Sequence, residues 1–314
     1  MDYDREQFQF TEKYRPHKIK DCILPDAQLV TFQKYVDAGQ VQNMLLCGSA
    51  GVGKTSVAKA LCEELDCDWI YINASIETGI EVLRTRIMQF ATAVSFDGKK
   101  KVVILDEFDR ASPNFQDAAK AFFEEFSNNC RFILTTNNKH KIIDPIISRM
   151  TVIEFKLEKT DKPKMAARFM QRIKEILAIE KIEYDEKVVA QLLMKYFPDY
   201  RRVLNELQFY SMNGKIDEGI LANVKDVNIK ELMKALKEKD FKLMRQWVVN
   251  NIDSDSSTIF RKIYDSSIDF VKPQSIPNLV LLLADYGYKS SFCSDQEINL
   301  VAALTEMMVN LDYI

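Results

Sequence analysis

The chain has 314 residues, of which 47% are hydrophobic and 28% charged, and its net charge is −3. This balance is typical of a folded globular protein, so it excludes disorder, collagen-like repeats and a wholly basic nucleic-acid coat. No apolar run approaches the ~20 residues that span a bilayer, and the acidic start of the chain does not resemble a signal peptide. Six cysteines in a chain of this length need no disulfides, so we expect reduced thiols in a cytoplasmic protein without a membrane segment.

From Val41 onward, short apolar runs alternate with amphipathic stretches. Strands are predicted at 41–47, 68–73, 101–105, 130–135 and 151–155, and helices at 54–65, 80–94 and 114–127. Strands that alternate with helices indicate an α/β domain whose parallel sheet is covered on both faces. After residue 155 the pattern is wholly helical, with predicted helices at 164–178, 185–196 and 201–212 and further helices from 229 to the end.

This pattern predicts three domains. They are an α/β domain at 1–157, a small helical domain at 158–227 and a second, all-helical domain at 228–314. Within the last domain, breaks between helices are predicted near residues 253–255, at Pro273 and around Gly287.

The segment after the first predicted strand fits the phosphate-loop pattern G-x-x-x-x-G-K-[ST]. It consists of Gly48, Ser49, Ala50, Gly51, Val52, Gly53, Lys54 and Thr55, and Ser56 follows it. Backbone N–H groups in such a loop and the start of the next helix form a site for phosphate oxygens. Lys54 would contact the β- and γ-phosphates, and Thr55 would give its hydroxyl to Mg²⁺. The alternative is a chance glycine-rich turn, which the flanking strand and helix disfavour.

Carboxylates follow the third predicted strand, where the apolar run Val102–Leu105 ends in Asp106 and Glu107. The carboxyl ends of parallel strands form the edge at which α/β proteins bind ligands. Asp106 would hold Mg²⁺ through water, and Glu107 would polarise an attacking water. Alone, this pattern is also compatible with an acidic strand-to-loop junction. Together with the phosphate loop it predicts hydrolysis of a nucleoside triphosphate.

Five further segments resemble the AAA+ ATPases and, among them, the replication-factor-C type of clamp loader. They are Glu12-Lys13-Tyr14-Arg15-Pro16, residues 73–84, Leu134-Thr135-Thr136-Asn137-Asn138, Ile146-Ile147-Ser148-Arg149 and Pro198-Asp199-Tyr200-Arg201. The resemblance covers residues 12 to about 225 and departs from the family pattern at Met150 and Pro198. The acidic box 106–109 and the run 95–98 resemble the T-even bacteriophage branch of this family.

The resemblance implies roles for particular residues in binding and hydrolysing ATP. Asn137 would reach the γ-phosphate or the water, Arg201 would lie on the phosphates of its own subunit, and Arg149 would serve a neighbour's nucleotide in trans. The adenine would lie near Tyr14, Arg15, Pro16 and Ile23.

The resemblance also implies a function and a set of partners. The chain would be an ATPase subunit that opens a ring-shaped sliding clamp and loads it onto primer–template DNA. It would act in a pentameric hetero-oligomer with several copies of itself, in the host cytoplasm if phage-encoded. Arg84 and Arg86 would contact DNA phosphates, and Gln116 and Lys120 would couple DNA to Glu107. On spacing alone, Gln116 and Lys120 are an ordinary exposed pair on a helix.

Two other functions remain open at this stage. One is an AAA+ helicase or branch-migration motor, which the Tyr14-Arg15-Pro16 signature disfavours. The other is a non-hydrolysing clamp-loader scaffold, which the presence of Glu107, Asn137 and Arg149 disfavours. A clamp contact is expected in residues 76–78 or 112–115, without a choice between them.

Overall fold

The computed structural model describes residues 8–75, 80–93, 98–212, 214–217, 229–251, 256–290 and 292–314, with the backbone alone at 80–83. The chain forms two compact units, Met1–Leu221 and Ala222–Ile314. The predicted clamp-contact turn at 76–78 and residues 95–97 of the bacteriophage-like run lie outside the described residues. The domain boundaries at 157 and 227 stay predictions.

The first unit is built on a parallel sheet with the strand order β2-β3-β4-β1-β5. The strands are β1 (Met44–Cys47), β2 (Asp68–Asn73), β3 (Lys101–Asp106), β4 (Cys130–Thr136) and β5 (Thr151–Glu154). Asn73 pairs with Asp106 and Leu105 pairs with Leu134, so the carboxyl ends of β2, β3 and β4 meet at one edge. This confirms the predicted α/β class and places the acidic end of β3 in the middle of that edge.

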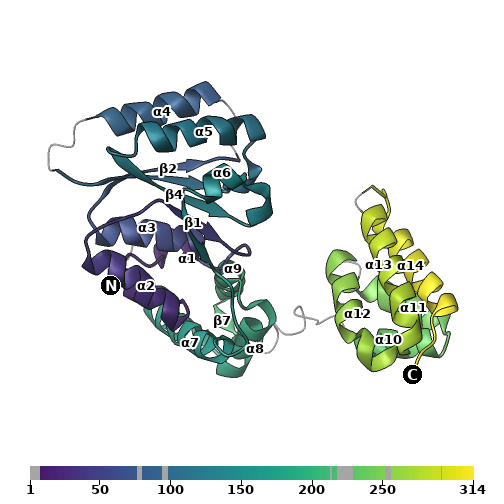
Figure 1. The fold of residues 1–314 in the computed structure, drawn as a ribbon. Coiled ribbons are helices and arrows are strands. Elements are labelled where there is room, and N and C mark those ends of the chain that lie inside the picture. The colour runs from purple at the N-terminus through teal and green to yellow at the C-terminus, as the bar shows by residue number, and fades with distance from the viewer. Residues whose placement is uncertain are drawn as a thin grey trace. The chain divides into compact units, whose positions relative to one another are not determined.

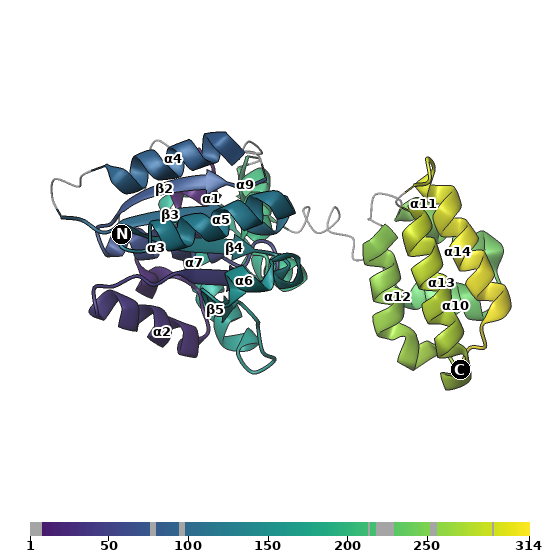
Figure 2. The same ribbon diagram turned by 45° about the horizontal axis from the view of Figure 1, so that its top comes forward.

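Helices cover both faces of the sheet (Figures 1 and 2). Their bounds are α1 (Phe10–Lys13), α2 (Asp26–Asp37), α3 (Lys54–Glu64), α4 (Ile80–Thr92), α5 (Pro113–Glu125) and α6 (Asp144–Ile147), with single 3₁₀ turns η1 (Ile19–Asp21), η2 (Phe108–Arg110) and η3 (Lys139–Lys141). α4, α5 and α6 lie on one face, and α2 and α3 lie on the other.

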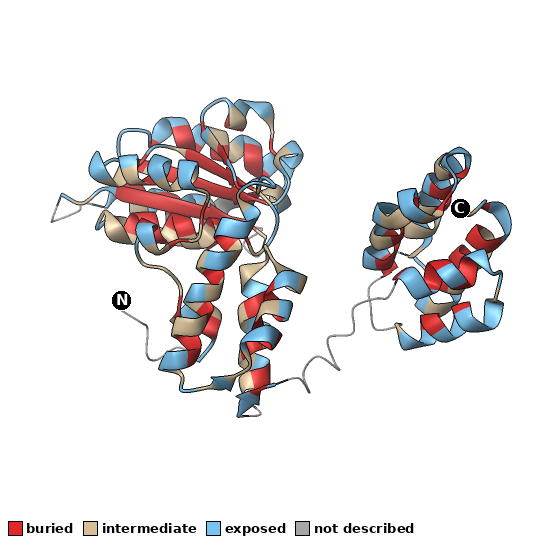
Figure 3. Cartoon of the chain, turned by 90° about the horizontal axis from the view of Figure 1, so that it is seen from below, coloured by how far each residue is buried: buried red, intermediate tan, exposed pale blue. Residues whose placement is uncertain are grey.

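Alternate residues of each strand supply the two cores. In β3, Val103 and Leu105 pack under α4 and α5, whereas Val102 and Ile104 pack against α3. Figure 3 shows the buried residues gathered along the strands and on the inward sides of the helices. A strand buried on both faces is continuously apolar, which is why β3 was predictable from sequence.

Three helices and a two-stranded pair complete the first unit. They are α7 (Lys162–Ile179), β6 (Glu183–Tyr184), α8 (Glu186–Tyr196), α9 (Tyr200–Ser211) and β7 (Lys215–Ile216). We call residues 162–216 the lid. α9 begins at the cap residue Asp199, whose carboxylate accepts the Arg202 N–H at 3.0 Å. Phe10 and Tyr14 pack with Ile176 of α7, so the N-terminal segment lies against the lid.

The second unit is helical throughout the described part. It contains α10 (Ile229–Lys237), α11 (Phe241–Asn250), α12 (Ser256–Phe270), the turn η5 (Pro273–Ser275), α13 (Ile276–Ser290) and α14 (Gln296–Asn310). The predicted break around Gly287 is wrong, because α13 continues through it. A Cβ at Gly287 would lie 4.0 Å from the Phe260 ring, an ordinary van der Waals contact, so the packing of this helix does not require glycine here. Among all described helices, none is long and apolar enough to span a membrane.

Candidate nucleotide-hydrolysis site

The phosphate loop lies between β1 and α3, in direct contact with the lid. Gly53 caps α3 with φ +92°, and Gly51 has φ +75°, a region that favours glycine. A Cβ on Gly51 would lie 1.8 Å from the Asp199 carboxylate, and the Tyr200 N–H donates to the Gly51 carbonyl at 3.1 Å. The start of α9 therefore rests on the loop, which positions Arg201 beside it.

The Lys54 ammonium is buried at the start of α3, with 7% of the residue exposed. It donates to the carbonyls of Gly48 at 2.8 Å and Ser49 at 2.7 Å, and to Asn137 Oδ1 at 2.8 Å. Burial lowers the pKa of Lys54, and the carboxylate of Asp106 opposes this shift. All three ammonium donors thus bind acceptors that phosphate oxygens could replace.

Three hydroxyl groups converge on Asp106 at the end of β3. Thr55 Oγ1 donates to Asp106 Oδ1 at 2.8 Å, Thr135 Oγ1 donates to the same oxygen, and the Tyr71 hydroxyl donates to Oδ2 at 2.7 Å. Burial, followed by the bond to Asp106, raises the pKa of Tyr71, so Tyr71 stays a neutral donor. Thr55 and Asp106 offer the oxygen ligands that Mg²⁺ prefers. Within the described residues no cluster of three metal-ligating acidic, His or Cys side chains exists.

Glu107 follows Asp106 in the left-handed region, with φ +51° and ψ +42°. Its N–H donates to Thr135 Oγ1 at 3.1 Å, and its Oε2 lies 3.5 Å from Arg110 Nε. A non-glycine residue in this conformation carries a cost of about 1–3 kcal/mol, and such residues are common at functional sites. Asp109 accepts the Asn137 N–H at 3.2 Å, so it supports the position of Asn137.

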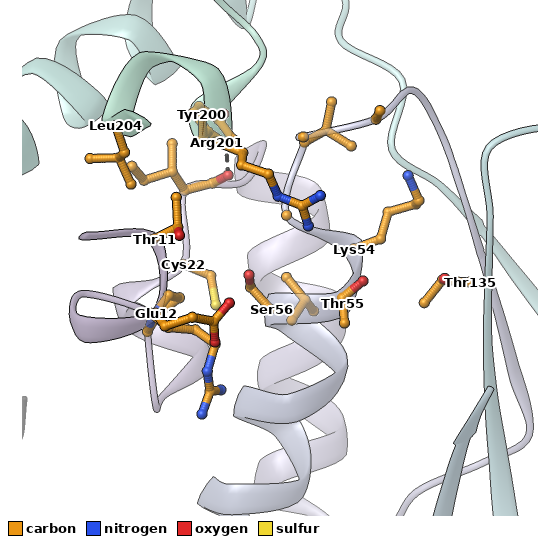
Figure 4. A pocket seen from close by; sticks show the side chains of 18 of the residues that line it. Thr11, Glu12, Cys22, Lys54, Thr55, Ser56, Thr135, Tyr200, Arg201 and Leu204 are labelled. Carbon is orange, nitrogen blue, oxygen red and sulfur yellow. Dashed lines mark hydrogen bonds between the residues drawn. The ribbon is translucent and has the colours of Figure 1, made fainter. Parts of the chain in front are cut away.

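One cavity collects most of the predicted site residues. Those that line it are Tyr14, Arg15, Pro16, Ile23, Ala50, Gly51, Val52, Gly53, Lys54, Thr55, Ser56, Asp106, Glu107, Asn137 and Arg201. Gly48 and Ser49 of the loop do not line the cavity, but their carbonyls accept from Lys54. Figure 4 shows Arg201 extending from the lid into the cavity, between Thr11 on one side and Lys54 on the other.

Apolar side chains also line the cavity. They are Cys22, Leu24, Phe169, Ile176 and Leu204, together with the ring of Tyr200. The Tyr200 hydroxyl donates to the Ile23 carbonyl at 3.4 Å, and its ring centroid lies 4.7 Å from that of Phe169. The sequence did not predict Phe169, Ile176 and Leu204 of the lid as cavity residues, because helical spacing marks an apolar face without showing what that face contacts.

Arg149 lies outside this cavity, directly after α6. Its Nε and Nη2 donate to Glu124 Oε1 at 2.9 and 2.5 Å, and its Nη1 donates to the Pro145 carbonyl at 2.6 Å. Arg84 and Arg86 are exposed on α4. None of these three arginines lines the cavity of its own chain.

Gln116 is buried, which corrects the interpretation of an ordinary exposed pair with Lys120. Only 3% of Gln116 is exposed, whereas Lys120 is partly exposed on the same helix. The Gln116 Nε2 donates to the Lys141 carbonyl at 2.9 Å, and the Gln116 Oε1 accepts the Ile143 N–H at 3.0 Å. The Gln116 side chain therefore connects α5 to the segment between β4 and α6. The four-residue spacing from Lys120 did not indicate this burial or these contacts.

The parallel sheet, phosphate loop and acidic strand end together define a phosphate-loop nucleotide hydrolase. The family model of the ATPases associated with various cellular activities (AAA) matches residues 44–157. The model of the AAA+ ATPase lid domain of the sliding-clamp-loader large subunit matches residues 161–222.

Relatives cover nearly the whole chain. The sliding-clamp-loader large subunits of Escherichia phage RB69 and Enterobacteria phage T4 are 36% and 35% identical, over 96% of this chain and 96% of each relative. A replication factor C small subunit of Halobacterium salinarum is 31% identical over 96% of this chain and 97% of its own. The chain belongs to the family of sliding-clamp-loader large subunits, which are AAA+ ATPases. This confirms the family resemblance seen in the sequence.

A solved structure shares the fold at low identity. The RuvB branch-migration motor of Thermotoga maritima matches with a TM-score of 0.55 and 16% identity, over 92% of this chain and 91% of its own. At this identity the likeness concerns the fold alone.

Proposed function

We propose that this chain uses ATP to open a ring-shaped sliding clamp and to load it onto primer–template DNA. The observation that supports this most is the convergence of Lys54, Asp106, Glu107, Asn137 and Arg201 on one cavity in a chain of the clamp-loader family. The proposal includes the cytoplasm of an infected host cell as the place of action.

In this proposal the cavity binds ATP with its triphosphate at the loop. Lys54 exchanges its carbonyl acceptors for β- and γ-phosphate oxygens, and Arg201 adds a second positive charge from the lid. Thr55, and Asp106 through water, would hold Mg²⁺, which would neutralise phosphate charge. Glu107 accepts hydrogen bonds from the attacking water, and Asn137 orients it or the γ-phosphate.

Arg149 belongs to a neighbour's site in this proposal. An arginine can stabilise transition-state charge only where a nucleotide is presented to it, and Arg149 does not line its own chain's cavity. Its guanidinium binds Glu124 at the surface and would exchange this partner for the neighbour's γ-phosphate. Hydrolysis would then require the proposed pentameric hetero-oligomer, with several copies of this chain beside other clamp-loader subunits.

DNA contact is assigned to α4, where Arg84 and Arg86 would bind backbone phosphates without reading sequence. Gln116 and Lys120 would carry the effect of DNA to Glu107. The buried bonds of Gln116 support a rigid connection between α5 and the segment that follows Asn137.

The test is the rate of ATP hydrolysis by the assembled complex, measured alone, with primed DNA, and with primed DNA plus clamp. We expect the clamp and DNA together to raise the rate well above DNA alone. Equal stimulation by DNA alone would favour the alternative of a translocating helicase or branch-migration motor. No hydrolysis under any condition, with ATP bound, would favour a scaffold subunit.

A further inference from the structure

Two consecutive glutamates in the last turn of α3 hold the N-terminal segment. Arg15 Nη2 donates to Glu63 Oε1 at 2.7 Å, and His17 Nδ1 lies 2.6 Å from Glu63 Oε2. The Ile19 N–H donates to Glu64 Oε2 at 2.7 Å. Both carboxylate oxygens of Glu63 are therefore engaged, and the helix that carries the phosphate loop at one end holds this segment at the other.

Arg15 lines the nucleotide cavity, whereas Glu63 and His17 do not. Its Nη1 atom is buried and has no hydrogen-bond partner within the described part of the chain. A buried donor left unsatisfied is costly, more so when it is charged. The guanidinium thus has Nη2 fixed by Glu63, while the N–H donors of Nη1 have no acceptor within the described part of the chain.

The position of Arg15 specifies which part of a nucleotide could supply that acceptor. Arg15 lies in the segment that includes Thr11 and Glu12, and Figure 4 shows these two across the start of α3 from Lys54 and Thr135. With the triphosphate at Lys54, the nucleoside faces this segment.

The lid holds the same segment from the other side. Lys13 Nζ donates to Glu180 Oε1 at 2.6 Å, and the Tyr14 hydroxyl donates to the same oxygen. Arg172 Nη2 donates to the Tyr14 carbonyl at 3.4 Å. The backbone around Arg15 is therefore fixed, so the direction of its guanidinium depends on the Glu63 contact.

We propose that Glu63 is a positioning residue for nucleoside recognition: it fixes Arg15 so that Nη1 donates to an acceptor on the base or ribose of ATP. His17 holds the second oxygen of Glu63 and keeps the carboxylate turned toward Arg15. This inference rests on the proposed binding of ATP in the cavity. Although Glu63 does not line the cavity, it would then help determine how much more tightly the cavity binds a nucleoside triphosphate than triphosphate alone.

The experiment compares the affinities of the full chain for Mg·ATP and for Mg·tripolyphosphate by titration calorimetry. Glu63→Ala is expected to weaken ATP binding about tenfold or more, which is the scale of a hydrogen bond to a charged group. Tripolyphosphate binding should stay within about twofold of wild type, because it does not reach Arg15. Arg15→Lys should lose the same factor, and the double variant should lose no more than either single one.

Glu63→Gln retains the size of the side chain and guards against misfolding. It is expected to weaken ATP binding less than Glu63→Ala while leaving tripolyphosphate binding unchanged. The matched control is Glu186→Gln, which neutralises the carboxylate that pairs with Lys174 at 2.5 Å on the lid surface, away from the cavity. It should change neither affinity.

Three results would overturn the inference. Unchanged ATP affinity in Glu63→Ala would show that Arg15 needs no positioning. Equal weakening of ATP and tripolyphosphate in both Glu63 variants would show that Glu63 supports the phosphate loop as a whole. A wild-type chain that binds neither ligand would overturn the proposed function, and this inference with it.

Discussion

Single side chains separate nucleotide binding from hydrolysis in this site. Lys54→Ala should weaken ATP binding, since it removes a buried ammonium whose donors face the phosphate position. Glu107→Gln should preserve binding and lower the hydrolysis rate by a factor of about 10² or more, because the carboxylate that polarises water is lost. Equilibrium binding and single-turnover hydrolysis measure the two effects, with Asp117→Asn on α5 as an exposed control. Normal hydrolysis by Glu107→Gln would remove Glu107 from the mechanism.

Cysteine reactivity gives a second test at the residue scale. Burial raises the pKa of Cys22 to about 12 and that of Cys47 to about 11, so both thiols stay protonated at pH 8. The thiolate is the nucleophile, and these two side chains are also shielded from reagents. Iodoacetamide at pH 8 should therefore modify the partly exposed Cys293 first, as followed by mass spectrometry. Equally fast modification of Cys22 would show that its surroundings are open.

The residues of the site that were predictable from sequence are those fixed by local spacing. Lys54 and Thr55 follow a glycine pattern, and Asp106 ends an apolar strand, so each has a short-range signal. The contacts of Glu63 with Arg15 and His17 join residues more than 45 positions apart in the sequence. No local sequence pattern predicts such contacts. The same holds for Gln116, whose backbone partners come from a later segment.

Among the structural elements, strand β2 was predicted with its exact bounds, and α13 was not. β2 begins after a turn and ends at Asn73, so polar residues mark both ends. In α13, Gly287 suggested a break, but the helix continues through it from Ile276 to Ser290. One glycine inside a helix costs only about 1 kcal/mol relative to alanine, so it does not by itself end the helix.

The connection of α5 to the segment before α6 depends on Gln116. In Gln116→Leu, the Lys141 carbonyl and the Ile143 N–H lose a buried partner, at a cost of about 2 kcal/mol. Urea unfolding should register this loss in the free energy of unfolding, whereas Lys120→Ala, on the same helix but partly exposed, should stay within about 0.5 kcal/mol of wild type. In the assembled complex, Gln116→Leu should also reduce stimulation by DNA. A stable variant with full stimulation would remove Gln116 from the coupling.

At the scale of the whole molecule, the proposed action of Arg149 in trans would make hydrolysis a property of the assembly. The isolated subunit should bind ATP and hydrolyse it slowly. Arg149→Ala should leave its own ATP affinity nearly unchanged and lower hydrolysis by the complex about 10³-fold. Mixing Arg149→Ala subunits with Glu107→Gln subunits should restore part of the rate, because some interfaces then pair an intact Glu107 with an intact Arg149. Confirmed mixed assembly without recovery would contradict action in trans.

The most direct test of the central claim is the retention of a labelled clamp on primed circular DNA. The complete loader, clamp and DNA are incubated with ATP or with a slowly hydrolysed analogue, and then washed at high salt. A topologically closed clamp resists salt, whereas contacts to phosphates do not. We predict salt-resistant clamp with ATP, little with the analogue, and little with a loader that carries Glu107→Gln. Equal retention without ATP, or none with ATP despite measured hydrolysis, would contradict the account.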